Sequence, residues 1–146
     1  MRTVLRAIAL LLGLLLVIQL IPVSRDNPPV TGPITAPPEI AATLRKGCYN
    51  CHSNETTWPW YSRVAPASWL IAHDVNEGRE HLNFSTWTAL SPSERQKVLL
   101  EMSEEVRKGS MPPGIYTPLH PEARLRLAEI NALAAWAEAE ATRGAQ

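Results

Sequence analysis

Cys48-Tyr49-Asn50-Cys51-His52 is a C-x-x-C-H pattern, and it contains the only two cysteines among the 146 residues of the chain. Two thiols at this spacing can add to the two vinyl groups of one haem, while the adjacent histidine binds the iron from the proximal side. The motif therefore predicts one covalently attached haem c. Cys48 and Cys51 would form the thioether bonds, and His52 would be the proximal iron ligand.

Three other kinds of site use two closely spaced cysteines, and they remain open at this point. A reactive dithiol of the thioredoxin kind accompanies a βαβ pattern. A disulfide is the simplest alternative, because cysteines of exported proteins are often oxidised. A structural zinc site needs four ligands, and the cysteines would have to be joined by members of a small set of histidines: His52, His73, His81 and His120.

Helical signals dominate the chain after residue 38, and no segment alternates like a strand. A short helix is expected to open at Pro37-Pro38-Glu39 and to lead directly into Gly47-Cys48, and a second helix is expected from about Pro66 to Leu82. A third should begin at Ser91, with Glu94 completing a capping box, and end at Gly109. A fourth should start at Pro121 with an apolar stripe of Ala123, Leu127, Ile130, Ala134 and Ala137, flanked by Leu133 and Trp136. The sequence predicts a small all-α domain over residues 39–141.

The N-terminal residues 1–23 have the pattern of an export or anchor segment. Arg2 and Arg6 precede a long apolar run, and no small-x-small cleavage site follows it. We therefore expect a transmembrane signal-anchor in the inner membrane, with the domain from Ser24 onward in the periplasm. The alternative is a cleaved signal and a free periplasmic or secreted domain.

Residues 24–38 contain five prolines and are expected to form an extended linker. The formal net charge of the whole chain is zero. Nucleic-acid-binding domains carry a strong basic excess, so no nucleic-acid partner is expected.

Met111 is the predicted distal ligand of the haem iron. It is followed directly by two prolines, so this segment cannot be helical and can carry the sulfur to the iron as a loop. Met102 is the internal competitor, but its helical spacing favours a core side chain. His73 and His81 are further candidates for the same position.

Three aromatic residues close behind the motif, Trp58, Trp60 and Tyr61, are candidate haem contacts. Flat rings suit the edge of a porphyrin, and a tryptophan or tyrosine could hydrogen-bond a propionate. Ordinary core packing is the competing interpretation for all three. His120, directly before Pro121, is expected to be a capping or loop residue.

Several separated stretches together resemble the bacterial haem-binding domain family of small cytochrome c-like proteins. They are the stretch from Cys48 to Ser62, Ala65-Pro-Ala-Ser-Trp, Asn83-Phe-Ser-Thr-Trp, Gly109-Ser-Met-Pro-Pro-Gly-Ile-Tyr and His120-Pro-Glu-Ala. The resemblance covers residues 39–137. It implies a cytochrome c-like fold, covalent haem and a periplasmic location.

The function expected from these features is one-electron transfer by an electron carrier rather than an enzyme, with redox partner proteins that the sequence does not identify. One alternative is a haem-based sensor or small-ligand-binding module with an open sixth iron position. Another is a peroxidase-type enzyme, which needs an open iron and a distal acid-base pair.

Overall fold

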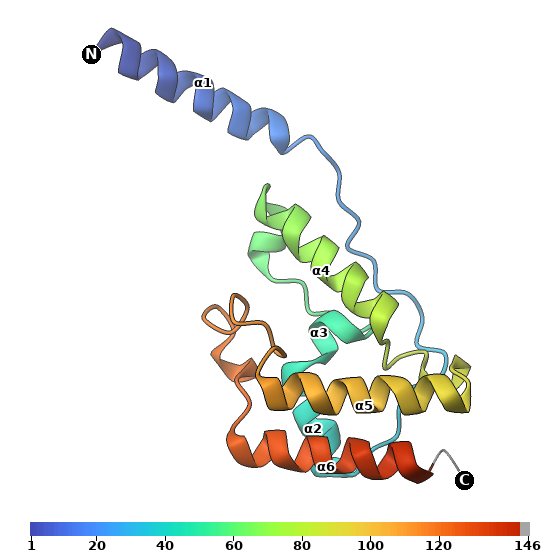
Figure 1. The fold of residues 1–146 in the computed structure, drawn as a ribbon. Helices are drawn as coiled ribbons and strands as arrows, with labels where there is room; N and C mark the ends of the chain where they lie inside the picture. The colour runs from blue at the N-terminus through green and yellow to red at the C-terminus, as the bar shows by residue number, and fades with distance from the viewer. Residues whose placement is uncertain (144–146) are drawn as a thin grey trace.

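The fold is built from helices, and the computed structural model describes residues 1–143. In chain order the elements are α1 (Arg2–Ile18), α2 (Pro38–Gly47), α3 (Tyr49–His52), η1 (Trp60–Arg63), α4 (Ala67–His81), η2 (Trp87–Ala89), α5 (Pro92–Lys108), η3 (Pro121–Ala123) and α6 (Leu127–Arg143) (Figure 1). Within these 143 residues the only β-type pairing is one isolated bridge between Gly32 and Thr86. The prediction of an all-α domain is confirmed.

The ends of α5 follow from its local sequence. The hydroxyl of Ser91 accepts a hydrogen bond from the backbone N–H of Glu94, and the Glu94 carboxylate accepts one from the backbone N–H of Ser91. This is the predicted capping box. Gly109 closes the helix in the left-handed region, with a φ of 74° that favours glycine.

The prediction for the fourth helix is wrong in its start and in part of its buried face. Residues 121–123 form a separate 3-10 turn, and α6 begins at Leu127, where the Glu129 carboxylate accepts the backbone N–H of Arg126 at 2.7 Å. Leu127 is therefore the first helical residue, and its side chain is 73% exposed. Leu133, expected at the flank, is completely buried.

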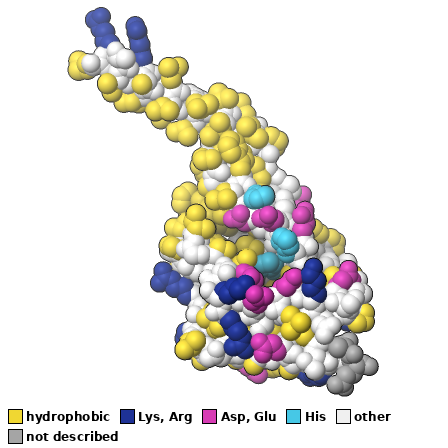
Figure 2. Space-filling view, in the orientation of Figure 1, with side chains coloured by type: hydrophobic (Ala, Val, Ile, Leu, Met, Phe, Trp, Pro, Cys, Tyr) yellow, Lys and Arg dark blue, Asp and Glu magenta, His cyan; other side chains and the backbone are white. Residues whose placement is uncertain are grey.

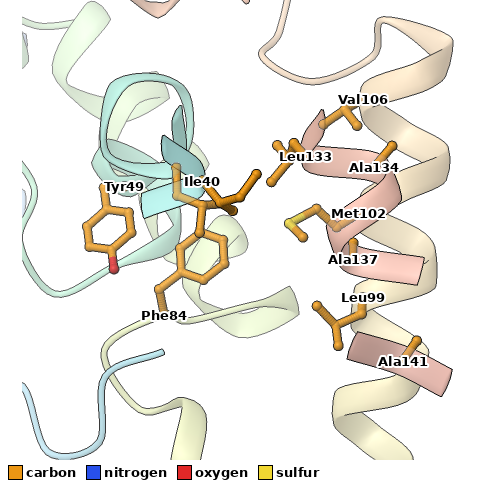
Figure 3. Packing of buried hydrophobic residues seen from close by; sticks show 11 residues of the cluster. Ile40, Tyr49, Phe84, Leu99, Met102, Val106, Leu133, Ala134, Ala137 and Ala141 are labelled. Atoms are coloured by element: carbon orange, nitrogen blue, oxygen red, sulfur yellow. The ribbon is translucent and has the colours of Figure 1, made fainter. Parts of the chain in front are cut away.

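The hydrophobic core lies between the α5–α6 pair and the segments around α2 and α3 (Figure 3). Small alanines on α6 allow α5 to pack closely against it, while larger side chains fill the space toward α2 and α3. The buried residues of this core are Ile40, Leu44, Tyr49, Phe84, Leu99, Met102, Val106, Leu133, Ala134, Ala137 and Ala141. The core thus fixes the motif region against the α5–α6 pair.

Helix α1 projects away from the rest of the domain, and none of its residues is buried (Figure 1). No helix in residues 1–143 is both long and apolar enough to cross a membrane. The transmembrane anchor expected for residues 1–23 is therefore not supported. Beyond Ile18 the helix gives way to a turn, and the Gln19 side chain bonds both the N–H and the carbonyl of Ala65.

Residues 24–38 are largely extended, but they do not hang free between α1 and the domain. The backbone N–H of Thr31 donates to the carbonyl of Ser85 at 3.1 Å, and that of Ile34 donates to the carbonyl of Phe84 at 2.9 Å. The segment is thus fixed along the surface of the domain.

Candidate functional site

One cavity of about 640 Å³ contains the predicted iron and thioether residues. Cys48, Cys51, His52 and Met111 all line it, although Met111 is 59 residues beyond His52 in the chain. Most of the remaining wall comes from α4, α5 and the loop that follows α5. The volume lies within the range of about 300–1,000 Å³ that is usual for small-molecule and cofactor sites.

Local helix geometry positions the three residues of the motif. Cys48 ends α2, and its carbonyl then accepts the backbone N–H groups of Cys51 and His52, at 3.1 and 2.9 Å. Residues three and four positions apart in a helix lie on one face. The single turn of α3 therefore presents both thiols and the imidazole to the same cavity.

The imidazole of His52 is oriented by α4. Its Nδ1 lies 2.8 Å from the carbonyl oxygen of Gly78 and 3.1 Å from that of Leu82, so Nδ1 carries the proton. Its Nε2 makes no hydrogen bond with any residue of the described chain. Burial lowers the pKa of His52 and outweighs the opposing effect of the two carbonyls. The neutral imidazole that binds a metal is therefore favoured, with its donor nitrogen free.

Sequence reasoning missed Gly78, which lets α4 approach the motif. A Cβ at this position would lie 2.8 Å from the carbonyl oxygen of Cys51, closer than real Cβ contacts allow. A glycine in the interior of a helical pattern was the available signal, because such glycines often mark close backbone approach.

The two cysteines are free thiols in the structure, and their environment keeps them protonated. Burial, together with the neighbouring Cys51, raises the pKa of Cys48 to about 12. Burial, followed by the charge of Asp74, raises the pKa of Cys51 to about 11. Reactive dithiols depend on a lowered pKa, so these thiols do not resemble a redox pair of the thioredoxin kind.

The described part of the chain also contains no set of ligands for zinc. No three side chains among its histidines, cysteines, aspartates and glutamates are grouped closely enough to hold a metal ion. A structural zinc site needs four such ligands. The apolar cavity beside the C-x-x-C-H motif fits a haem better than it fits a metal ion alone.

The two spacer residues of the motif have separate structural roles. The ring of Tyr49 stacks on Phe84 in the core, with centroids 5.3 Å apart. The side-chain amide of Asn50 donates to the hydroxyl of Tyr116 at 2.8 Å and accepts the backbone N–H of Thr57. Tyr49 thus ties the motif to the core, and Asn50 ties it to the loop after α5.

The loop between α5 and η3 forms one wall of the cavity. Met111, Pro113, Ile115 and Tyr116 all line the cavity, and Met111 is 38% exposed. The predicted loop position of Met111 is confirmed, whereas the roles of Ile115 and Tyr116 as lining residues were missed. They follow Met111 in the same Pro-Pro-Gly-Ile-Tyr stretch, so their proximity in sequence was a usable signal.

The other candidates for the distal position are distributed unequally. Met102 is a core residue, as its helical spacing predicts, but it also contributes to the cavity wall. His81 lines the cavity as well. His73 does not line it, and its exposed imidazole lies 3.5 Å from the Glu77 carboxylate.

Only one of the three candidate aromatic contacts lines the cavity. That residue is Tyr61. The indole of Trp58 donates to the side-chain carbonyl of Asn27 at 3.3 Å, and Trp60 is 78% exposed. The structure therefore does not bring the two tryptophans together with the motif.

Acidic side chains surround much of the cavity. Five of them, from α4 and α5, line it: Asp74, Glu77, Glu101, Glu104 and Glu105. Acidic and histidine side chains also gather on one face of the molecule beneath the apolar α1 (Figure 2). Burial raises the pKa of Asp74. The rim of the cavity is thus predominantly negative.

A comparison with protein families supports the chemistry indicated by this geometry. The haem-binding domain family matches residues 13–139, which include the whole motif, the cavity and the loop. No curated protein and no solved structure is significantly similar to the chain.

Proposed function

The chain belongs to the haem-binding domain family, and from this we propose that it carries one covalent haem c and transfers single electrons. The observation that carries the proposal is the shared cavity of Cys48, Cys51, His52 and Met111. In this assignment the two cysteines form the thioethers, and His52 supplies Nε2 to the iron.

The protein's own contribution is to hold, orient and shield the cofactor. The carbonyls of Gly78 and Leu82 fix the His52 ring and its tautomer. Apolar side chains of α4 and α5, among them Ile71, Val75 and Val106, line part of the cavity. Haem, when bound, would supply an iron that alternates between the ferric and ferrous states, and apolar lining favours the less charged ferrous state.

In this proposal Met111 would be the second protein ligand of the iron. Its place on a cavity-lining loop supports this assignment, and a thioether opposite histidine raises the reduction potential. An iron held by both His52 and Met111 would offer no open position to a substrate. That arrangement is typical of an electron carrier rather than an enzyme.

Met111 is partly exposed, and this favours a second candidate function in which its loop moves away from the iron. If the loop leaves the iron, the sixth position opens and the domain becomes a small-ligand sensor or a peroxidase-type enzyme. Carbon monoxide binding to the reduced protein distinguishes electron transfer from these two alternatives. A reduced protein whose spectrum does not change with carbon monoxide supports electron transfer, and ready binding supports the alternatives.

The decisive experiment is to produce the full chain with a haem-attachment system and measure its mass after denaturation. We expect the mass of one haem to remain on the protein. The control is the double variant Cys48→Ser and Cys51→Ser, which should release all haem into acid-acetone. Extraction of haem from the unsubstituted protein would contradict covalent attachment.

We also propose that the domain works on the periplasmic side of the inner membrane. Support comes from Arg2 and Arg6 ahead of the apolar α1, a pattern typical of export signals, and from the absence of any buried residue in α1. Cell fractionation with N-terminal sequencing tests this proposal. A mature start at or after Ser24 indicates a cleaved signal, and intact protein in the cytoplasm contradicts export.

A further inference from the structure

A group of titratable side chains lies beside the cavity and includes none of the residues assigned to the thioethers or to the iron. The Tyr61 hydroxyl donates to Nε2 of His120, and Nδ1 of His120 donates to the Glu122 carboxylate at 2.9 Å. The ring of Tyr116 stacks on the His120 imidazole, with centroids 4.1 Å apart and planes 11° from parallel. The imidazole is thus held on three sides, and its side chain is only 13% exposed.

These contacts make a continuous hydrogen-bonded path from the cavity to water. Tyr61 and Tyr116 both line the cavity, while the Glu122 side chain is 63% exposed to solvent. A histidine between a hydroxyl and a carboxylate can accept a proton at one ring nitrogen while the other nitrogen remains bonded. A tyrosine hydroxyl can act as donor or acceptor, so the path survives protonation of the ring.

We propose that Tyr61, His120 and Glu122 form a redox-linked proton site, in which His120 takes up one proton from solvent when the haem in the cavity is reduced. This inference rests on the proposed function and adds a coupled proton to it. One electron arrives from an external one-electron donor and converts ferric iron to ferrous iron. One proton from water is bound at Nε2 of His120, while Nδ1 keeps its own hydrogen and its bond to the Glu122 carboxylate, so the net charge of the site is unchanged.

The direction of the coupling follows from electrostatics. An electron added to a low-dielectric cavity makes it more negative, and nearby negative charge favours the protonated form of a base. When Nε2 binds the proton, it becomes the donor to the Tyr61 oxygen. The phenolic hydrogen of Tyr61 is then free to turn toward the cavity.

The groups that face His120 are known from each element packed against it: Tyr61 from η1, Tyr116 from the loop and Glu122 from η3. Burial raises the pKa of both tyrosines, so they stay neutral. Hydrogen bonds to its own backbone N–H and to His120 lower the pKa of Glu122, so it stays charged. The imidazole thus lies between two neutral tyrosines and one carboxylate.

Other titratable groups line the cavity and compete for the same role. On α4 these are Asp74, Glu77 and His81, and on α5 they are Glu101, Glu104 and Glu105. Asp74 is the strongest competitor because burial raises its pKa. Any test must therefore distinguish His120 from Asp74 and His81.

The test uses the haem-loaded full chain and two measurements between pH 5 and 8. The first is the midpoint potential, which should show a stretch where the reduction equilibrium changes tenfold per pH unit, about 59 mV for one electron. The second is proton uptake on reduction, followed with an indicator dye in weakly buffered solution. Uptake should approach one proton per haem in the same pH range.

Substitutions assign the proton to a residue. His120→Asn should abolish both the pH dependence and the uptake, while the matched control His73→Asn, at an exposed histidine outside the cavity, should leave both unchanged. Glu122→Gln removes an exposed carboxylate, and it should move the pH-dependent stretch to lower pH, because a negative partner of the imidazole is lost. It provides an independent check if His120→Asn does not fold.

The outcomes separate this inference from the proposed function. Covalent haem that cycles between oxidation states without proton uptake overturns the redox-linked proton site alone. Uptake that persists in His120→Asn, a pH-dependent stretch that does not move in Glu122→Gln, or uptake that disappears in Asp74→Asn or His81→Asn also overturns it. A chain that binds no covalent haem overturns both proposals.

Discussion

His52 donates a hydrogen bond to the carbonyl of Gly78, and the missing side chain of Gly78 makes this close contact possible. Nδ1 of His52 lies 2.8 Å from the Gly78 carbonyl, and this approach is possible because Gly78 has no Cβ to meet the Cys51 main chain. The glycine therefore both orients the imidazole and allows α4 to lie against the motif.

Gly78→Ala should weaken the site although alanine favours helix. The new Cβ meets backbone atoms, which cannot rotate away, and overpacking of this kind costs about 1–3 kcal/mol. Urea unfolding should show the loss of stability, and the ferric spectrum should show a changed environment of His52. Gly114→Ala is the matched control, because its Cβ would meet nothing within 4 Å. Equal stability of the two variants would contradict the prediction.

Thiol alkylation should be slow in the haem-free protein and should accelerate steeply with pH. Only the thiolate reacts, and the pKa values of about 12 for Cys48 and about 11 for Cys51 lie above the ordinary 9.0. At pH 8 we expect rates about 1,000-fold and about 100-fold below those of an unhindered thiol. Iodoacetamide labelling with peptide mass analysis measures both rates, and urea-unfolded protein is the control. Rapid labelling of folded protein at pH 8 would refute the assigned environment.

Met111→Ala should open the sixth iron position in the haem-loaded protein. The variant should lose the weak near-infrared band of methionine-to-iron ligation, and its ferrous form should bind carbon monoxide. Met102→Leu is the control, because it nearly conserves volume in the core and should leave the band in place. An unchanged Met111→Ala spectrum would assign the position to another cavity-lining residue, with His81 tested next.

Acid should weaken the contact between α2 and α6 through Glu129. Lys46 Nζ lies 2.7 Å from both Glu129 oxygens. Hydrogen bonds from the Arg126 backbone, and then from Lys46, lower the pKa of Glu129 from 4.5 to about 2. A lowered pKa in the folded state means that the stabilisation is complete above pH 4.5 and is lost as pH falls toward 2.

Glu129→Gln should therefore reduce the free energy of unfolding at pH 7 by about 2 kcal/mol. The difference from the unsubstituted protein should shrink at pH 3, where part of the stabilisation is already lost. Urea unfolding at the two pH values measures this, with Glu140→Gln as a control on the same helix. A difference that does not depend on pH would show that Glu129 acts by packing rather than by charge.

Features with a local cause were accessible from the sequence. The capping box at Ser91 and the left-handed Gly109 both depend on residues within one helical turn, and both appear as predicted. The motif residues and Met111 could be named for the same reason, since the pattern and the two prolines act locally. Their meeting in one cavity required the fold.

Features that depend on distant partners could not be predicted from the sequence. The start of α6 at Leu127 depends partly on Glu129, which is held by Lys46 from α2. His120 looked like a loop residue because its partner Tyr61 is 59 residues away in the chain. In each case the decisive contact joins segments that periodicity and capping signals treat separately.

The two middle positions of the C-x-x-C-H motif are formally free, yet in this chain each is matched to a residue elsewhere. Tyr49 is matched to the ring of Phe84, and Asn50 to the hydroxyl of Tyr116. Residues in contact tend to change together during evolution. Among relatives of this chain, substitutions at position 49 should accompany changes at 84, and those at 50 should accompany changes at 116. The two variable positions of the motif would then vary with the core and with the loop after α5, respectively.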